Sequence, residues 1–137
     1  MMRIGFLPSD FNPMILMLGE AEDIRALSGV LRRFGRDRVE VAFGDLGFCH
    51  VIGADVLLTA ADGPFGVQAR DQRNFLWRVP PDMAIGFADR LEDLAEPGRV
   101  AGSENLDCGT EDGIVVKVSR GEYTDDFLGS GGGQPLF

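Results

Sequence analysis

The sequence has few of the residues that most catalytic and metal-binding motifs require. Its 137 residues include one histidine, one lysine, one tryptophan, one tyrosine and two cysteines. A single histidine excludes zinc sites that need two, such as His-Glu-x-x-His. The one lysine, Lys117, follows Val116, so the phosphate-binding Gly-x-x-x-x-Gly-Lys loop is absent. No serine lies in a Gly-x-Ser-x-Gly nucleophile elbow.

Long apolar runs are also missing. The longest, Met14 to Leu18, is far too short to span a bilayer. The start, Met1 to Pro8, lacks the apolar stretch and the small-residue cleavage site of a signal peptide. The composition, 45% hydrophobic and 26% charged, is that of an ordinary globular chain. We therefore expect one folded cytoplasmic domain that does not bind a membrane.

Basic side chains are scarce. Thirteen Lys and Arg stand against twenty-two Asp and Glu, a net charge of −9, which opposes nucleic acid and anionic membranes as partners. Residues 1–79 hold ten acids and nine bases, whereas residues 80–137 hold twelve acids and four bases. The C-terminal part is therefore expected to form one exposed acidic platform, either for a basic protein or for a cation. The alternative is a solvated acidic face that only keeps the protein soluble.

The spacing of apolar residues predicts two helices. In residues 20–34, one face carries Ile24, Leu27, Leu31 and Phe34. Gly35 follows and is expected to be the left-handed C-cap. A second helix is expected to open at Pro80 and Pro81 and to end before Pro97. Its apolar face carries Ala84, Phe87, Leu91 and Leu94.

Alternation and turn residues predict the strands. They are expected at 3–7, 14–18, 39–43, 48–52, 56–60, 65–69, 75–79, 104–108 and 114–119. Segments 56–60, 65–69 and 75–79 are expected to form a meander, and the last two segments a closing hairpin. The helices do not alternate regularly with the strands. We therefore predict an α+β fold, with a mostly antiparallel sheet of about six to eight strands and two helices.

The chain is expected to end in a tail. Residues 1–128 would form a single α+β domain, and residues 129–137 a Gly-rich C-terminal tail. Its apolar tip, Leu136 and Phe137, is expected to dock on its own domain or on a neighbouring copy. Docking on a neighbouring copy would make the protein a structural homodimer subunit with the tail as an arm.

Cys49, His50 and Cys108 are the candidate nucleophile residues. Adjacent strand residues point to opposite faces, so the Cys49 and His50 side chains are expected to diverge. Cys108 could meet His50 only through a tertiary contact. The two cysteines form no Cys-x-x-Cys motif, and two unrelated thiols of a cytosolic protein are the simplest interpretation. We therefore favour a structural histidine and predict no catalytic residue.

Acidic and aromatic side chains supply the other candidates. The acids near the C-terminus are Glu104, Asp107, Glu111, Asp112, Glu122, Asp125 and Asp126. Paired carboxylates could act in a small hydrolase or hold a hard cation, but residues 107–113 do not match a calcium loop, so no metal or cofactor is predicted. Trp77 shares a strand face with Phe75 and is expected to cover a helix. Tyr123 could anchor an interface.

The last third of the chain resembles a known group of proteins. Asn105-Leu106-Asp107, followed by Val-Val-Lys-Val-Ser-Arg-Gly-Glu-Tyr at 115–123, is similar to the ending of a diffuse group of small bacterial proteins. That group includes uncharacterised single-domain proteins and immunity-type proteins of contact-dependent toxin systems. The resemblance implies a non-enzymatic cytoplasmic protein that binds a protein partner, such as a basic toxin domain. The expected contacts are Glu111, Asp112, Glu122, Tyr123 and Asp125.

Overall fold

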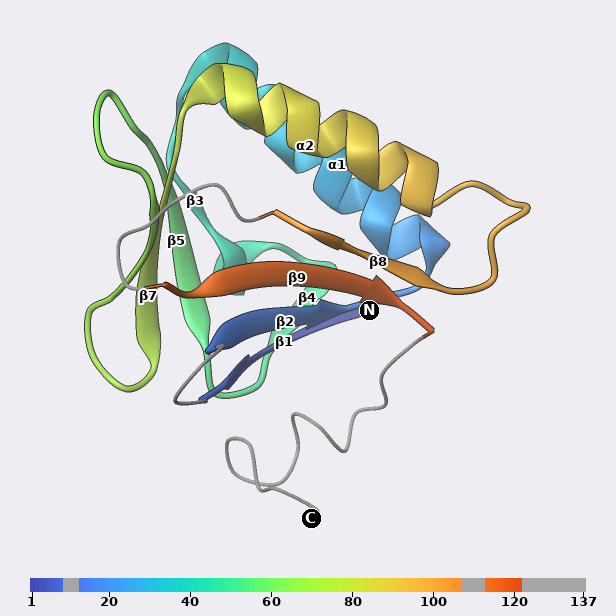
Figure 1. Cartoon of the computed structure of the whole chain (residues 1–137), viewed down its shortest axis with the longest axis horizontal. Coiled ribbons are helices and arrows are strands. Elements are labelled where there is room, and N and C mark those ends of the chain that lie inside the picture. The colour runs from blue at the N-terminus through green and yellow to red at the C-terminus, as the bar shows by residue number, and fades with distance from the viewer. Residues whose placement is uncertain (9–12, 107–112, 122–137) are drawn as a thin grey trace.

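The structure is a computed structural model that describes residues 1–8, 13–106 and 113–121. The elements are β1 (Met2–Leu7), β2 (Met14–Leu18), α1 (Ala21–Asp37), β3 (Val41–Ala42), η1 (Phe43–Asp45), β4 (Cys49–Val51), β5 (Asp55–Ala60), β6 (Gly66–Ala69), β7 (Asn74–Val79), α2 (Pro81–Leu94), β8 (Gly102–Asn105) and β9 (Val115–Arg120). The two helices lie side by side on one side of the molecule, with β1, β2 and β9 beneath them (Figure 1). This arrangement confirms the α+β class and the two helices.

The strands divide between two mixed sheets rather than forming one. The order in the five-stranded sheet is β4-β1-β2-β9-β8, and in the four-stranded sheet β3-β5-β7-β6. The closing hairpin is confirmed, because β8 pairs antiparallel with β9. The expected meander is wrong in one pairing. β7 lies between β5 and β6, and it pairs parallel with β5.

Helix α1 is longer than expected. At its start the Glu20 backbone N–H donates to the buried Asp23 carboxylate at 2.9 Å. At its end Arg38, with φ 58°, adopts the left-handed conformation expected for Gly35. The prediction of a Gly35 cap is therefore wrong. Gly35 lies where α2 crosses α1, and a Cβ there would lie 2.7 Å from both Ile85 Cγ1 and the Pro81 carbonyl oxygen.

The main core lies between the helices and both sheets. Its largest side chain, Trp77 on β7, is 1% exposed. The Trp77 ring stacks on Phe87 of α2 with centroids 6.1 Å apart and lies 6.2 Å from the ring of Phe43. Phe75 is buried on the same strand face. The prediction that Trp77 covers a helix is confirmed.

Candidate functional site

The five residues expected to contact a partner all lie outside the described residues. Glu111 and Asp112 belong to segment 107–112, and Glu122, Tyr123 and Asp125 belong to segment 122–137. Asp107, Cys108, Asp126 and the tail at 129–137 lie there too. The structure does place the acids of α2 and β8, and it shows which of them are paired.

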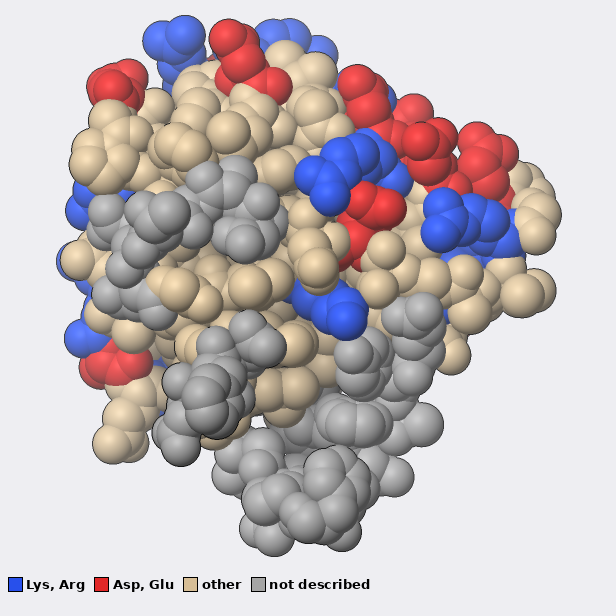
Figure 2. All heavy atoms as spheres, viewed as in Figure 1, with Lys and Arg blue, Asp and Glu red and all other residues tan. Residues whose placement is uncertain are grey.

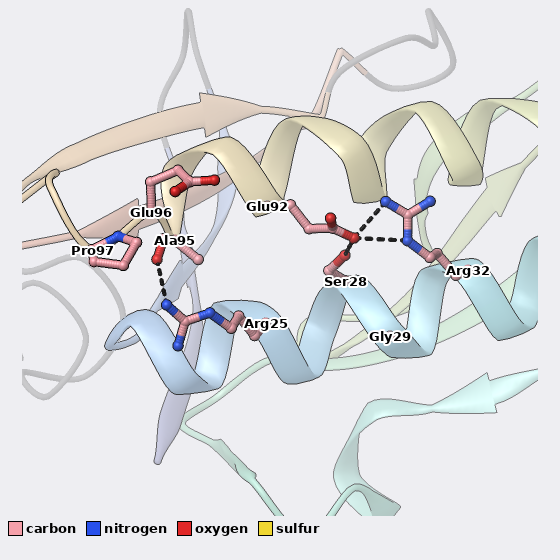
Figure 3. Close-up of a pocket in the computed structure, with 8 residues that line it drawn as sticks. All are labelled: Arg25, Ser28, Gly29, Arg32, Glu92, Ala95, Glu96 and Pro97. Atoms are coloured by element: carbon pink, nitrogen blue, oxygen red, sulfur yellow. Dashed lines mark hydrogen bonds and ion pairs between the residues drawn. The ribbon is translucent and has the colours of Figure 1, made fainter.

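A groove of about 320 Å³ runs between the two helices (Figure 3). From α1, Arg25, Ser28 and Arg32 point into it, and they are met by Glu92 of α2 and the chain that follows α2. Gly29 lies among them and presents no side chain. Charged and polar side chains line this groove, so their contacts bear on whether it can be an active site.

The charged groups of the groove bind one another. Arg32 Nε donates to Glu92 Oε2 at 2.8 Å, and Arg32 Nη2 donates to Asp89 Oδ1 at 2.6 Å and also to Glu92. Hydrogen bonds to Asp89 and Glu92 raise the pKa of Arg32 above its ordinary value. Both carboxylates therefore share one guanidinium that stays charged.

Hydrogen bonds of Ser28 and Arg25 complete the contact between the helices. The buried Ser28 Oγ lies 3.0 Å from the Ala88 carbonyl oxygen and 3.1 Å from Glu92 Oε2. Arg25 Nη2 donates to the Ala95 carbonyl oxygen at 2.9 Å, at the end of α2. Arg25, Ser28, Arg32 and Glu92 each have a protein partner here, and their contacts join α1 to α2.

Sequence reasoning missed this contact, although a signal was present. Arg25, Ser28 and Arg32 recur at helical spacing beside the apolar stripe of α1. Such a polar stripe at the border of the buried face indicates contacts with a neighbouring helix. Nothing local to α1 identifies Asp89 and Glu92 as the partners of Arg32.

The expected acidic platform is partly neutralised. An arginine from the first half of the chain, Arg32, pairs with Asp89 and Glu92, and Arg90 pairs with Glu104 at 2.8 Å. Within residues 1–8, 13–106 and 113–121, these three acids therefore do not form an unpaired negative surface. The expectation of a single uninterrupted acidic platform is therefore wrong for the part that Asp89, Glu92 and Glu104 would form.

A narrower acidic stripe remains on α2. Asp82, Asp89 and Asp93 recur at intervals of seven and four residues, so these three lie opposite the buried face of α2, and the exposed Glu96 follows the helix. We call these four residues the α2 stripe. Asp82, Asp93 and Glu96 are exposed and form no ion pair in the described part of the chain. Figure 2 shows acids gathered over the C-terminal half of α2, with arginines between them.

The end of α2 is electrostatically unusual. Carbonyl groups give a helix C-terminus partial negative charge, which favours basic side chains there. The last turn of α2 has none, and it carries Glu92 and Asp93 with Glu96 just beyond. Arg120 Nη1 of β9 offsets part of this by donating to the Leu94 and Glu96 carbonyl oxygens at 3.0 and 2.9 Å. The carboxylates of Asp93 and Glu96 therefore oppose helix stability.

Cys49 and His50 diverge as expected. Cys49 packs against the main core from β4, and His50 on the same strand is exposed. Burial, with the charge of Asp23, raises the pKa of the Cys49 thiol from 9.0 to about 12. The thiol is therefore neutral at pH 7, which opposes a nucleophilic role.

We predict that Cys49 is unreactive in the folded protein. In a Cys108→Ser variant, Cys49 is the only cysteine. Because its pKa is raised from 9.0 to about 12, its thiolate fraction is about a thousandfold lower than that of an exposed thiol. Alkylation by iodoacetamide near pH 8, followed by mass spectrometry, measures the rate. The same variant in urea is the control and is expected to react fast. Equal rates in the two conditions would contradict the burial of this thiol.

The described residues show neither a metal-binding cluster nor a membrane-spanning helix. Among the described residues, no three His, Cys, Asp or Glu side chains are grouped so that they could hold a metal ion. No described helix combines the length and the apolar character needed to cross a membrane. Comparison of the chain with protein-family models, with curated proteins and with solved structures gives no match.

Proposed function

We propose that the protein is a non-enzymatic binding module that recognises a basic protein through the α2 stripe. One observation carries the proposal: Asp93 and Glu96 are exposed and unpaired within the described residues, at a helix end where negative charge is unfavourable. Side chains that weaken the fold at an exposed position are typical of a surface used for binding. Val100, in the loop that follows α2, is an exposed apolar side chain.

The nature of the partner follows from charge. Acids on one exposed face attract a partner with a basic surface and raise the rate of its association. The resemblance to immunity-type proteins supports the same class of partner, a basic toxin domain. Glu111, Asp112, Glu122, Tyr123 and Asp125 stay proposed additional contacts.

We predict opposite effects on stability and on binding when the α2 stripe is neutralised. In the Asp93→Asn, Glu96→Gln variant, loss of the unfavourable charges is expected to raise the free energy of unfolding by about 0.3–1 kcal/mol per site. The same variant is expected to bind the partner at least about tenfold more weakly. Urea denaturation gives the first quantity, and calorimetric titration of a partner captured at low salt gives the second.

The control for this experiment is Asp62→Asn, which removes an exposed acid from the loop between β5 and β6. It is expected to leave the partner's Kd unchanged within about twofold. Undiminished binding by the α2 variant would overturn the proposal. So would the capture of no protein whose binding weakens as salt is raised.

A further inference from the structure

A second groove is formed by α1 and the chain that follows it. Its volume is about 410 Å³, and it lies between the C-terminal half of α1 and residues 39–46. Arg38, with φ 58°, turns the chain after α1, and residues 39–46 form the facing wall of the groove. That wall includes β3, which follows the end of α1 (Figure 1). We call this surface the β3 groove.

Most of the residues that line the β3 groove are apolar. Val30 and Phe34 of α1 are buried, and Val41 and Leu46 of the facing wall are half-buried. Val39 also lines the groove, and it is 66% exposed, one of the few large apolar side chains that the described residues leave open to water. Sites for small molecules are concave and largely apolar, with volumes of about 300–1,000 Å³. The β3 groove therefore suits a small molecule with an apolar body.

The remaining lining side chains are charged, and they include both signs. Arg33 is the cation, and Asp37, Glu40 and Asp45 are the acids. All four are exposed. Asp37 pairs with Arg36 at 3.6 Å, whereas Arg33, Glu40 and Asp45 form no ion pair within the described residues. Opposite charges thus line one apolar groove without neutralising one another.

This separation of charge distinguishes the β3 groove from the groove between the helices. There, Arg32 pairs with acids of α2. In the β3 groove, the guanidinium of Arg33 can donate to an anion, and the carboxylates of Glu40 and Asp45 can accept from a cation. Hydrogen bonds between ionised groups are among the strongest that proteins form. The ligand that complements this lining carries one group of each sign on an apolar body.

We propose that the β3 groove binds an α-amino acid with an apolar side chain, because such a molecule joins these three groups on one carbon atom. The ligand's carboxylate accepts hydrogen bonds from Arg33, and its ammonium lies by Glu40 and Asp45. Its apolar side chain packs against Val39 and Leu46. The site does not depend on the α2 stripe, because none of its lining residues belongs to α2.

The test titrates the full chain with L-phenylalanine and follows the backbone amide signals by nuclear magnetic resonance. We expect the largest shifts in the amides of residues 30–46. Each of three further probes lacks one feature: 2-phenylethylamine the carboxylate, 3-phenylpropanoate the ammonium, and glycine the apolar side chain. Each is expected to bind at least about tenfold more weakly than L-phenylalanine. No shift of these amides at about 10 mM L-phenylalanine, or equal binding of any of the three probes, would overturn the proposal.

Two variants test the role of each charge. Arg33→Gln is expected to weaken L-phenylalanine binding about tenfold but not to weaken 2-phenylethylamine binding, because the amine has no carboxylate. The Glu40→Gln, Asp45→Asn variant is expected to weaken the binding of both probes. Arg73→Gln, which removes an exposed arginine from the loop between β6 and β7, is the control and should change neither. Unchanged L-phenylalanine binding by either of the groove variants would overturn the proposal.

Discussion

Replacing Trp77 by alanine is expected to lower the free energy of unfolding by about 3–5 kcal/mol. The side chain is 1% exposed and is the largest in the core. It comes from β7, which pairs with both β5 and β6, and its ring contacts Phe87 of α2 and Phe43. The substitution therefore leaves a cavity where the four-stranded sheet meets the helix layer. Urea denaturation followed by far-ultraviolet circular dichroism measures the loss.

Trp77→Phe is the matched control, because it keeps an aromatic ring against Phe87. It is expected to lose only part of that free energy. A loss below about 1 kcal/mol for the alanine variant would show that the ring is not in the packed core. Trp77 is also the only tryptophan of the chain, so its fluorescence reports unfolding in every other variant.

Gly35→Ala and Gly29→Ala are expected to change stability in opposite directions. At Gly35 a new Cβ would lie 2.7 Å from the Pro81 carbonyl oxygen and 2.7 Å from Ile85 Cγ1, and the backbone atom cannot move aside without shifting α2. Overpacking of this kind costs about 1–3 kcal/mol. At Gly29 nothing lies within 4 Å, so alanine gains its helix propensity of about 0.5–1 kcal/mol.

The two variants test one helix with one chemical change. Both positions lie inside α1, so helix propensity alone would stabilise both. Thermal unfolding followed by circular dichroism measures the two shifts in Tm. A rise in Tm for Gly35→Ala would mean that the helices are not in close contact at Pro81. A fall for Gly29→Ala would mean that the groove between the helices is filled at that point.

Local pattern was enough to locate the helices and most strands, but not the contacts between them. The apolar stripe of α1 identifies the helix, because burial of one face imposes its period on the sequence. Gly35 follows arginines at the end of the apolar stripe, which makes it locally a good C-cap. The structure instead requires glycine there because the backbone of α2 lies too close for a Cβ. The parallel pairing of β5 with β7 also could not be predicted from local pattern. The alternation of apolar residues shows which face of a sheet each side chain lies on, but not which strands are neighbours.

The acidic composition of the candidate surface could be predicted from the sequence, but the ion pairs that its acids form could not. The sequence places the excess of acids after residue 80. It cannot show that Arg32 folds back onto Asp89 and Glu92, which follow it by 57 and 60 residues. Which acids stay unpaired therefore depends on the crossing of α1 and α2. The dipole argument for Asp93 needs the observed end of the helix as well.

The lengths of the strands bear on how copies of this protein avoid one another. Among the described strands, those at the sheet borders are the short ones: β3 has two residues, β4 has three, and β6 and β8 have four each. The interior strands have five or six. Such borders present few free backbone groups for an incoming strand. Fibril-like stacking is thereby discouraged, and recognition is left to side chains.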